Sequence, residues 1–244
     1  MLLPGSVLPA APAYGALLEV LGERVDAAAK ELEVYATDEP PADYTLATEI
    51  DGILREADAR GFDRFHLVGY SGGGAAALAF AAAHGEWLLS LALLEPAWAG
   101  NDRTPEEDAL AERFRAIEQL PEEQRMAEFM RLQLAPGVEP PRPDGPPPPW
   151  LANRPAGIRA FIRAFETGEL DLAALRRFRQ PVLFVLGGLS NPDYFARMAK
   201  RLAVVFPDFT LETFSERRHF DPPHRVEPER LAALLLTLWQ RGED

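Results

Sequence analysis

Short apolar runs alternate along this chain with longer segments in which apolar residues recur at helical spacing. The apolar runs predict strands at residues 2–3, 32–36, 65–69, 88–94, 181–186 and 209–214. The amphipathic or alanine-rich segments predict helices at residues 14–29, 46–60, 72–84, 192–205 and 228–239. Because repeated strand–helix units place their strands in parallel, we expect an α/β fold: a mostly parallel sheet with helices on both faces.

The alternation stops between Trp98 and Arg179. Helical spacing there predicts helices near residues 106–120, 122–134 and 158–167. Residues 136–150 hold eight of the 23 prolines, so we expect stiff, extended chain in that stretch. The expected organisation is a core of residues 1–97 and 180–244 with an inserted helical cap of residues 98–179 over the strand ends. Most apolar side chains of the insertion are expected to pack the cap against the core.

Composition narrows the class of protein. The 244 residues suit one large α/β domain or a domain with an insertion. A net charge of −13 argues against a nucleic-acid partner and disfavours strongly anionic substrates. The absence of cysteine excludes disulfides and thiolate metal sites. The first residues lack the features of a secretion signal, and no apolar run approaches the roughly 18 residues of a membrane span, so a cytoplasmic location is expected.

The most informative motif lies at residues 65–74, Phe-His-Leu-Val-Gly-Tyr-Ser-Gly-Gly-Gly. A buried strand runs there into Gly-x-Ser-x-Gly and then into an alanine-rich helix, which is the sequence form of a nucleophile elbow. Glycines tolerate the strained backbone of such a turn and let strand and helix approach each other. Ser71 is therefore the candidate nucleophile. The alternative is a glycine-rich turn without a chemical role.

The chain resembles the α/β-hydrolase superfamily over nearly its whole length. The resemblance rests on the motif of residues 69–73, on the strand at 181–187 with its following helix, and on His219 after the last strand. The segment 83–96 is also similar to the family's segment after the nucleophile. The resemblance implies a triad in the chain order serine, acid, histidine.

The chain departs from the family pattern at its N-terminal end. The first strand is similar to the family's third strand, so the usual antiparallel hairpin at the start of the sheet is missing. Residues 32–36 would then form the edge of the sheet. Glu31 and Glu33 would act there as charges that discourage pairing with another edge.

A serine nucleophile needs a base, and imidazole is the side chain that titrates near neutral pH. His66 lies inside a strand and His84 ends the helix after the elbow, so structural roles are expected for both. His219 and His224 follow the last strand. The resemblance implies His219 as the base, with His224 as the alternative or as a residue that packs the loop.

The acid has three candidates. Most family members carry an aspartate in the loop after the penultimate strand, where this chain has Ser190. Haloalkane dehalogenases and some lipases of the superfamily place their acid after the same strand, which Glu95 ends in this chain. We therefore favour Glu95 as the acid of the triad. It would orient His219 and stabilise the imidazolium. Asp193, in the first turn of a helix where an acid offsets the helix dipole, is the alternative, and Asp221 is third.

An oxyanion hole needs two backbone N–H groups aimed at the developing charge. The resemblance implies that Gly72, the residue after the nucleophile, supplies one of them. The loop after the first strand should supply the other, and the family's His-Gly pair is Pro-Gly at residues 4–5 here. The donor is then the N–H of Ser6 or of Val7.

Three aromatic residues are candidates for the wall of a substrate pocket. Tyr70 stands between the glycine and the serine of the motif, a position often given to variable packing. Trp98 and Trp150 flank parts of the insertion and suit either an apolar acyl pocket or the core of the cap.

These features predict a serine hydrolase that cleaves a carboxylic ester, thioester or lactone through an acyl-enzyme on Ser71. The expected partner is a small-molecule acyl substrate, with no metal ion and no organic cofactor implied. Dehalogenase chemistry is not expected, because it needs a carboxylate nucleophile. The alternatives are an acyltransferase or lyase that uses the same residues, and a binding protein of the same fold without turnover.

Overall fold

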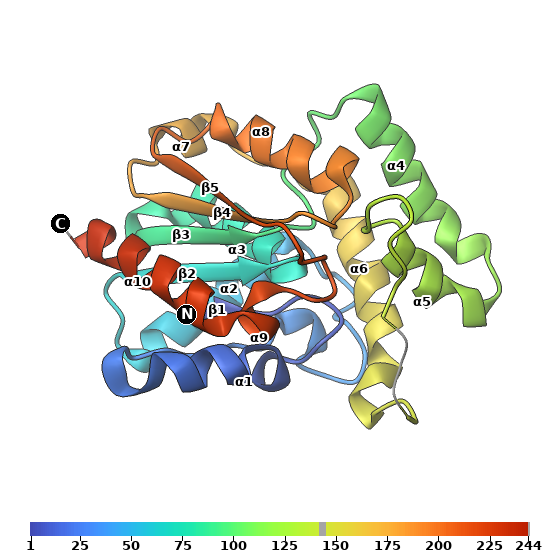
Figure 1. The fold of residues 1–244 in the computed structure, drawn as a ribbon, viewed down its shortest axis with the longest axis horizontal. Coiled ribbons are helices and arrows are strands. Elements are labelled where there is room, and N and C mark those ends of the chain that lie inside the picture. The colour runs from blue at the N-terminus through green and yellow to red at the C-terminus, as the bar shows by residue number, and fades with distance from the viewer. Residues whose placement is uncertain (142–144, 244) are drawn as a thin grey trace.

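The computed structural model describes residues 1–141 and 145–243. Its strands form one parallel sheet of five, in the order β1-β2-β3-β4-β5 (Figure 1): Leu2–Leu3, Phe65–Tyr70, Leu88–Leu94, Val182–Gly187 and Phe209–Phe214. The helices α1 to α5 are Ala10–Leu21, Leu46–Arg60, Gly72–His84, Pro105–Ala116 and Glu122–Arg131. The helices α6 to α10 are Arg154–Thr167, Leu172–Arg177, Arg197–Ala203, Pro223–Val226 and Pro228–Glu243. This is the α/β fold expected from the sequence.

The central strands are apolar on both faces, as strands covered by helices on both sides must be. In β3, Leu91 and Leu93 join the core beneath α2, α3, α7 and α8, whereas Ala92 and Leu94 join the core beneath α1 and α10. Strand β4 alternates in the same way. Two hydrophobic layers therefore fix the sheet, and with it the ends of the strands.

Helices α4, α5 and α6 lie beyond the carboxyl ends of the strands (Figure 1). They all belong to the segment between β3 and β4. Helix α7, from the same segment, packs instead against α3 on a face of the sheet. The helices at the strand ends are therefore those of residues 105–167, and the rest of the segment returns to the sheet.

The predicted strand at residues 32–36 is wrong, and so is the prediction that it forms the edge of the sheet. The segment contains a 3₁₀ turn, and β1 is the edge strand of the described sheet. The buried carboxylate of Glu49, from α2, accepts the N–H groups of Glu33 and Val34 at 2.9 and 3.0 Å. A side chain thus satisfies the backbone donors that a strand would pair with its neighbour.

The other elements differ from the predictions mainly at their ends. The first helix stops at Leu21 rather than continuing to residue 29, because Gly22 takes a positive φ of 56°. A π-helical turn, Pro192–Ala196, precedes α8 within the predicted helix 192–205. The extended stretch predicted at residues 136–150 lies partly outside the described residues. The helices at 46–60 and 72–84 and the strands at 88–94 and 209–214 match their predicted bounds.

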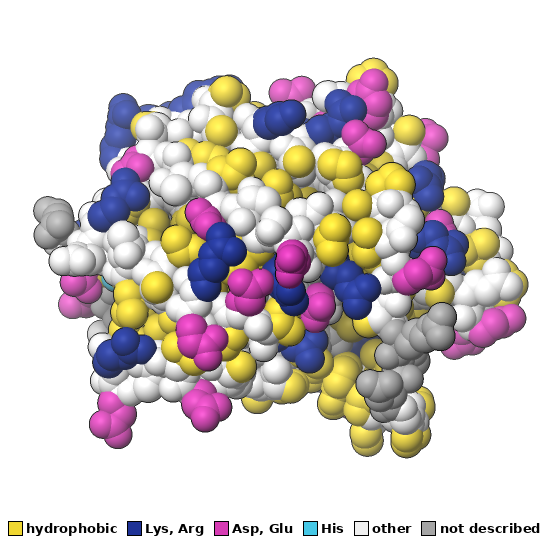
Figure 2. Space-filling model, in the orientation of Figure 1, with side chains coloured by type: hydrophobic (Ala, Val, Ile, Leu, Met, Phe, Trp, Pro, Cys, Tyr) yellow, Lys and Arg dark blue, Asp and Glu magenta, His cyan; other side chains and the backbone are white. Residues whose placement is uncertain are grey.

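The surface seen in Figure 2 carries acidic and basic side chains interspersed with apolar ones, without a field of one sign. Within the described ranges, no helix has both the length and the apolar content needed to cross a bilayer.

Candidate active site

Ser71 lies on a sharp turn between β2 and α3. Its backbone has φ 51° and ψ −116°, a conformation that residues other than glycine rarely adopt. The glycines around it permit the turn, since a Cβ on Gly69 would lie 2.4 Å from the carbonyl oxygen of Gly73. The strained residue is held by its neighbours. Its N–H donates to Leu94 at 3.1 Å and its carbonyl accepts the N–H of Ala97 at 2.9 Å. The end of β3 thus fixes the turn.

His219 is buried between the serine and a carboxylate. Its Nε2 lies 3.0 Å from the Oγ of Ser71, and its Nδ1 lies 2.9 Å from an oxygen of Glu95. The ring stacks on Phe195, with centroids 4.5 Å apart and planes 13° apart. The structure therefore brings Ser71, His219 and Glu95 into one line of hydrogen bonds.

Glu95 directly follows β3, and each of its carboxylate oxygens makes a hydrogen bond. One faces His219, and the other accepts the N–H of Gly187 at 2.7 Å. Its backbone takes a positive φ of 46°, and its own N–H donates to Val185 at 3.2 Å. The carboxylate is thereby fixed by β4 as well as by the strand that it ends.

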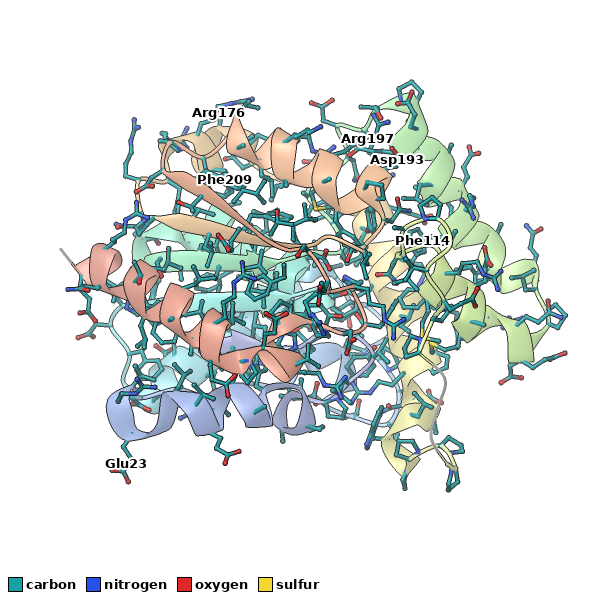
Figure 3. All side chains as sticks on the ribbon, viewed as in Figure 1. Glu23, Phe114, Arg176, Asp193, Arg197 and Phe209 are labelled. Atoms are coloured by element: carbon teal, nitrogen blue, oxygen red, sulfur yellow. The ribbon has the colours of Figure 1, made fainter. Side chains whose placement is uncertain are left out.

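The alternative acids lie in other surroundings. Asp193 is an exposed residue that bonds Arg197 at 3.1 Å, one helical turn further on, and Figure 3 shows the two side chains together beside α8. Asp221 lies 3.8 Å from Arg217. Ser190 is buried in the loop where the family commonly has its aspartate. Among the three carboxylates that the sequence left open, the one in contact with His219 is Glu95.

His224 packs the loop after β5. Its ring lies 4.8 Å from each of the rings of Tyr14 and Tyr70. Burial, with smaller contributions from Arg225 and His219, lowers the pKa of His224 to about 3. A group with this pKa stays neutral and is a poor proton acceptor near neutral pH.

Two of the three residues predicted for the oxyanion hole, Gly72 and Ser6, lie against each other beside Ser71. Gly72 is the first residue of α3, where N–H groups have no partner inside the helix. A Cβ on Gly72 would lie 2.3 Å from the Oγ of Ser6, so the loop after β1 packs directly over this helix start. The hydroxyl of Tyr35 donates to the carbonyl of Ser6 at 2.7 Å. Because the peptide unit is planar, this bond also fixes the direction of the N–H of Val7.

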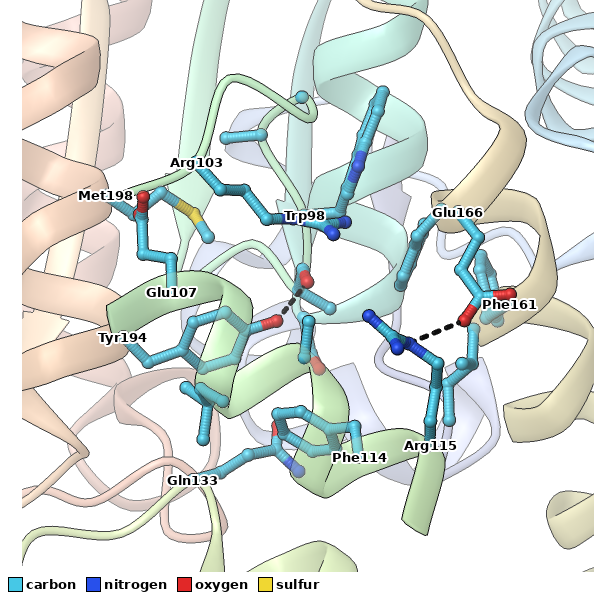
Figure 4. A pocket seen from close by; sticks show the side chains of 18 of the residues that line it. Trp98, Arg103, Glu107, Phe114, Arg115, Gln133, Phe161, Glu166, Tyr194 and Met198 are labelled. Atoms are coloured by element: carbon cyan, nitrogen blue, oxygen red, sulfur yellow. Dashed lines mark hydrogen bonds and ion pairs between the residues drawn. The ribbon is translucent and has the colours of Figure 1, made fainter. Parts of the chain in front are cut away.

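Ser71 opens into a cavity between the sheet and α4, α5 and α6 (Figure 4). Its described wall is mainly apolar and aromatic, and it includes Trp98, Leu110, Phe114, Phe129, Ile158, Phe161, Ile162, Phe165, Tyr194 and Met198. Charged side chains of the wall are Arg103, Glu107, Arg115, Glu166 and Arg201. The arrangement suits an apolar group next to the serine.

The three aromatic residues predicted for the pocket separate in the structure. Among the described residues that line the cavity, Trp98 is present, whereas Tyr70 and Trp150 are not. The Tyr70 hydroxyl donates to the carbonyl of His219, so this side chain holds the backbone of His219. Trp150 lies near Arg154, whose guanidinium carbon is 5.8 Å from the centre of the Trp150 ring.

Sequence reasoning missed two residues that position the site. Phe195 stacks on His219, and Tyr35 holds the loop of Ser6. The sequence predicts Tyr35 in a strand and Phe195 in the helix at residues 192–205. Local patterns carry no signal for such contacts between distant segments.

Among the described residues, no three histidine, aspartate or glutamate side chains gather as a metal site requires.

Solved structures share the fold at low sequence identity. NosK from Streptomyces actuosus has a TM-score of 0.68 and 16% identity, over 100% of this chain and 97% of its own. A thermophilic esterase from Thermogutta terrifontis has a TM-score of 0.65 and 19% identity, over 100% and 89%. A proline iminopeptidase from Mycobacterium smegmatis has a TM-score of 0.59 and 18% identity, over 99% and 89%. Identities this low establish the fold alone.

No curated protein matches the sequence of this chain. The sequence profile of one family does match it, along residues 2–234. With the parallel sheet and the turn at Ser71 described above, this match over nearly the whole chain identifies it as a member of the alpha/beta hydrolase family.

Proposed function

We propose that this protein is a serine hydrolase that cleaves a carboxylic ester, thioester or lactone through an acyl-enzyme on Ser71. Membership of the alpha/beta hydrolase family supports a hydrolase. The observation that carries the finer proposal is the continuous contact from Ser71 through His219 to Glu95, with distances of 3.0 and 2.9 Å. A small-molecule acyl substrate and a cytoplasmic location belong to the same proposal.

In the first step, Ser71 attacks the acyl carbonyl while His219 accepts its proton at Nε2. Glu95 accepts the Nδ1–H of the ring, which keeps Nε2 free to take the proton and stabilises the imidazolium. His219 then returns the proton to the leaving group. In the second step, His219 takes a proton from the water that attacks the acyl carbonyl, and it returns this proton to the Oγ of Ser71 as the acyl–serine bond breaks and the carboxylic acid leaves.

The developing oxyanion is held by backbone N–H groups. Gly72 supplies one from the start of α3, and Ser6 or Val7 supplies the other from the loop after β1. This assignment rests on the close packing of that loop over Gly72 and on the Tyr35 hydroxyl, which fixes the Ser6 carbonyl. Donors held before the reaction need no reorganisation when charge develops.

The helices over the strand ends act in this proposal as a cap that holds the acyl group. Phe161 and Phe165 of α6 and Phe114 of α4 line the same cavity as Ser71. Their contacts favour an apolar acyl chain over a strongly hydrated one.

The test is the release of 4-nitrophenolate from 4-nitrophenyl butyrate. We expect an initial burst close to one product per active site, if deacylation limits the rate, and no turnover above background in Ser71→Ala. Ser215→Ala changes an exposed serine outside the site and serves as the control that keeps wild-type activity. Turnover retained in Ser71→Ala would contradict the proposal. Product analysis with an added alcohol separates hydrolysis from acyl transfer.

A further inference from the structure

Three arginines line the cavity that contains Ser71, although most of its wall is apolar. A charge in such surroundings is costly unless it is paired. Arg201 meets both oxygens of Glu107, at 2.9 and 3.0 Å. Arg115 meets Glu166 at 3.0 Å. Two of the three positive charges therefore have a close carboxylate partner within the protein.

The positive charge of Arg103 has no such close carboxylate partner among the described residues. Among the described residues, the carboxylate paired with it is Asp108, at 3.9 Å, and that side chain is 59% exposed. The side chain of Arg103 itself is only 18% exposed. Its close contact is with a neutral group: the guanidinium donates to the side-chain amide oxygen Oδ1 of Asn101 at 2.5 Å. The side chain of Arg103 is thus largely buried without a close ion pair.

The guanidinium is also held in place. The oxygen of Asn101 accepts the indole N–H of Trp98 at 3.1 Å, and the amide nitrogen of Asn101 donates to Gly168 at 2.7 Å. Figure 4 shows Arg103 reaching into the cavity beside Trp98, with Tyr194 on the other side. An arginine fixed by one nitrogen keeps its other donors for a ligand, and its planar fork matches a carboxylate.

We propose that Arg103 binds a carboxylate at the far end of the substrate's acyl group, so that the substrate class is a monoester or monothioester of a dicarboxylic acid. This inference rests on the proposed function of Ser71. The aromatic wall contacts the methylene groups between the ester carbonyl and the carboxylate. The substrate carboxylate gives Arg103 the close anionic partner that Glu107 and Glu166 provide for Arg201 and Arg115.

The test compares two esters that differ only in the terminal charge: mono-4-nitrophenyl adipate and its terminal methyl ester, with the corresponding suberate and sebacate pairs to cover the chain length. The readout is the ratio of kcat/KM for the free carboxylate to kcat/KM for the methyl ester. In the wild type, we expect a ratio above ten for at least one chain length. Because a hydrogen-bonded charge contributes about 1.5–3 kcal/mol, Arg103→Met should lower this ratio by about 10- to 100-fold.

Two further variants make the comparison specific. Arg103→Lys keeps the charge without the planar fork, so its ratio should fall between those of the wild type and Arg103→Met. Arg113→Met changes an arginine of α4 that is 61% exposed and pairs with Glu128, and it should keep the wild-type ratio. Thermal unfolding checks that each variant is folded.

The possible failures are distinguishable. If both members of each pair are hydrolysed equally well and Arg103→Met leaves the ratio unchanged, Arg103 does not bind a substrate carboxylate. The proposed role of Ser71 would stand in that case. If the wild type hydrolyses neither member of any pair nor 4-nitrophenyl butyrate, the proposed function fails and the inference fails with it.

Discussion

The two walls of the cavity hold their side chains in different ways. On the sheet side, Ser71 and Glu95 stand at strand ends with strained backbones, each tied to the neighbouring strand by main-chain hydrogen bonds. In α3, ten of the 13 residues are buried, whereas α5 on the opposite wall has no fully buried residue. Ser71 and Glu95 therefore gain their positions from a packed backbone. On the opposite wall, α6 has six buried residues, whereas α5 is held by partly buried side chains and ion pairs, which vary more readily without loss of the fold.

The largest effect is expected from a substitution on the sheet side of the cavity, at Glu95. Glu95→Gln keeps the shape of the side chain but no longer stabilises the imidazolium. A fall in kcat of about 10⁴ is expected, as for the orienting aspartate of serine proteases. Asp193→Asn is the matched control and should keep near-wild-type kcat. The reverse result in steady-state kinetics would assign the acid to Asp193.

The next effect tests the packing of the loop after β1 over α3. Gly72→Ala places a Cβ 2.3 Å from the Oγ of Ser6, so the Ser6 side chain or the loop that carries it must shift. Loss of one oxyanion donor corresponds to a fall in kcat of about 10²–10³. Gly15→Ala introduces the same methyl group in α1, where nothing lies within 4 Å, and should leave kcat unchanged. Equal activity in both variants would mean that the close packing of Ser6 over Gly72 is not needed to position the oxyanion donors.

Hydrogen exchange measures the contrast between the walls without a mutation. Segments with few buried contacts open at lower free energy than the core does. We therefore expect amides of α5 to exchange at least about tenfold faster than those of α3, measured by mass spectrometry on the native protein. Equal protection of the two helices would remove the contrast.

The smallest expected effect concerns acid stability. Burial keeps His224 neutral in the folded protein down to a pKa of about 3, whereas the unfolded chain binds its proton near 6.5. Unfolding therefore takes up a proton in this window, and the free energy of unfolding falls as the pH drops from 6.5 towards 3. His224→Phe should lower this proton uptake by about one and flatten the dependence in denaturant titrations. An unchanged slope would show that His224 does not contribute to it.

The sequence could predict the fold because strand β3 and helix α3 carry patterns that need no knowledge of distant contacts. It failed at residues 32–36, where apolar residues suggest a strand but the Glu49 carboxylate takes the backbone donors. No spacing rule places a carboxylate from another helix beside that segment.

The candidate site was predictable only in part. Ser71 carries its own local motif, and His219 was identified by its place after the last strand. The acid was not fixed by the sequence, because Glu95 and Asp193 both follow strands that end at the same edge of the sheet. The distance to His219 depends on backbone angles at Glu95 and on packing against Phe195, and neither can be read from residue types.

The central claim is that Ser71 is a nucleophile activated by His219. A fluorophosphonate reagent tests it most directly, because it forms a covalent bond with an activated serine. Mass spectrometry of the treated, folded protein should locate one adduct, on the peptide that contains Ser71, and His219→Ala should label much more slowly. Absence of the adduct from Ser71 in the folded wild-type protein, or equal labelling of His219→Ala, would contradict the account.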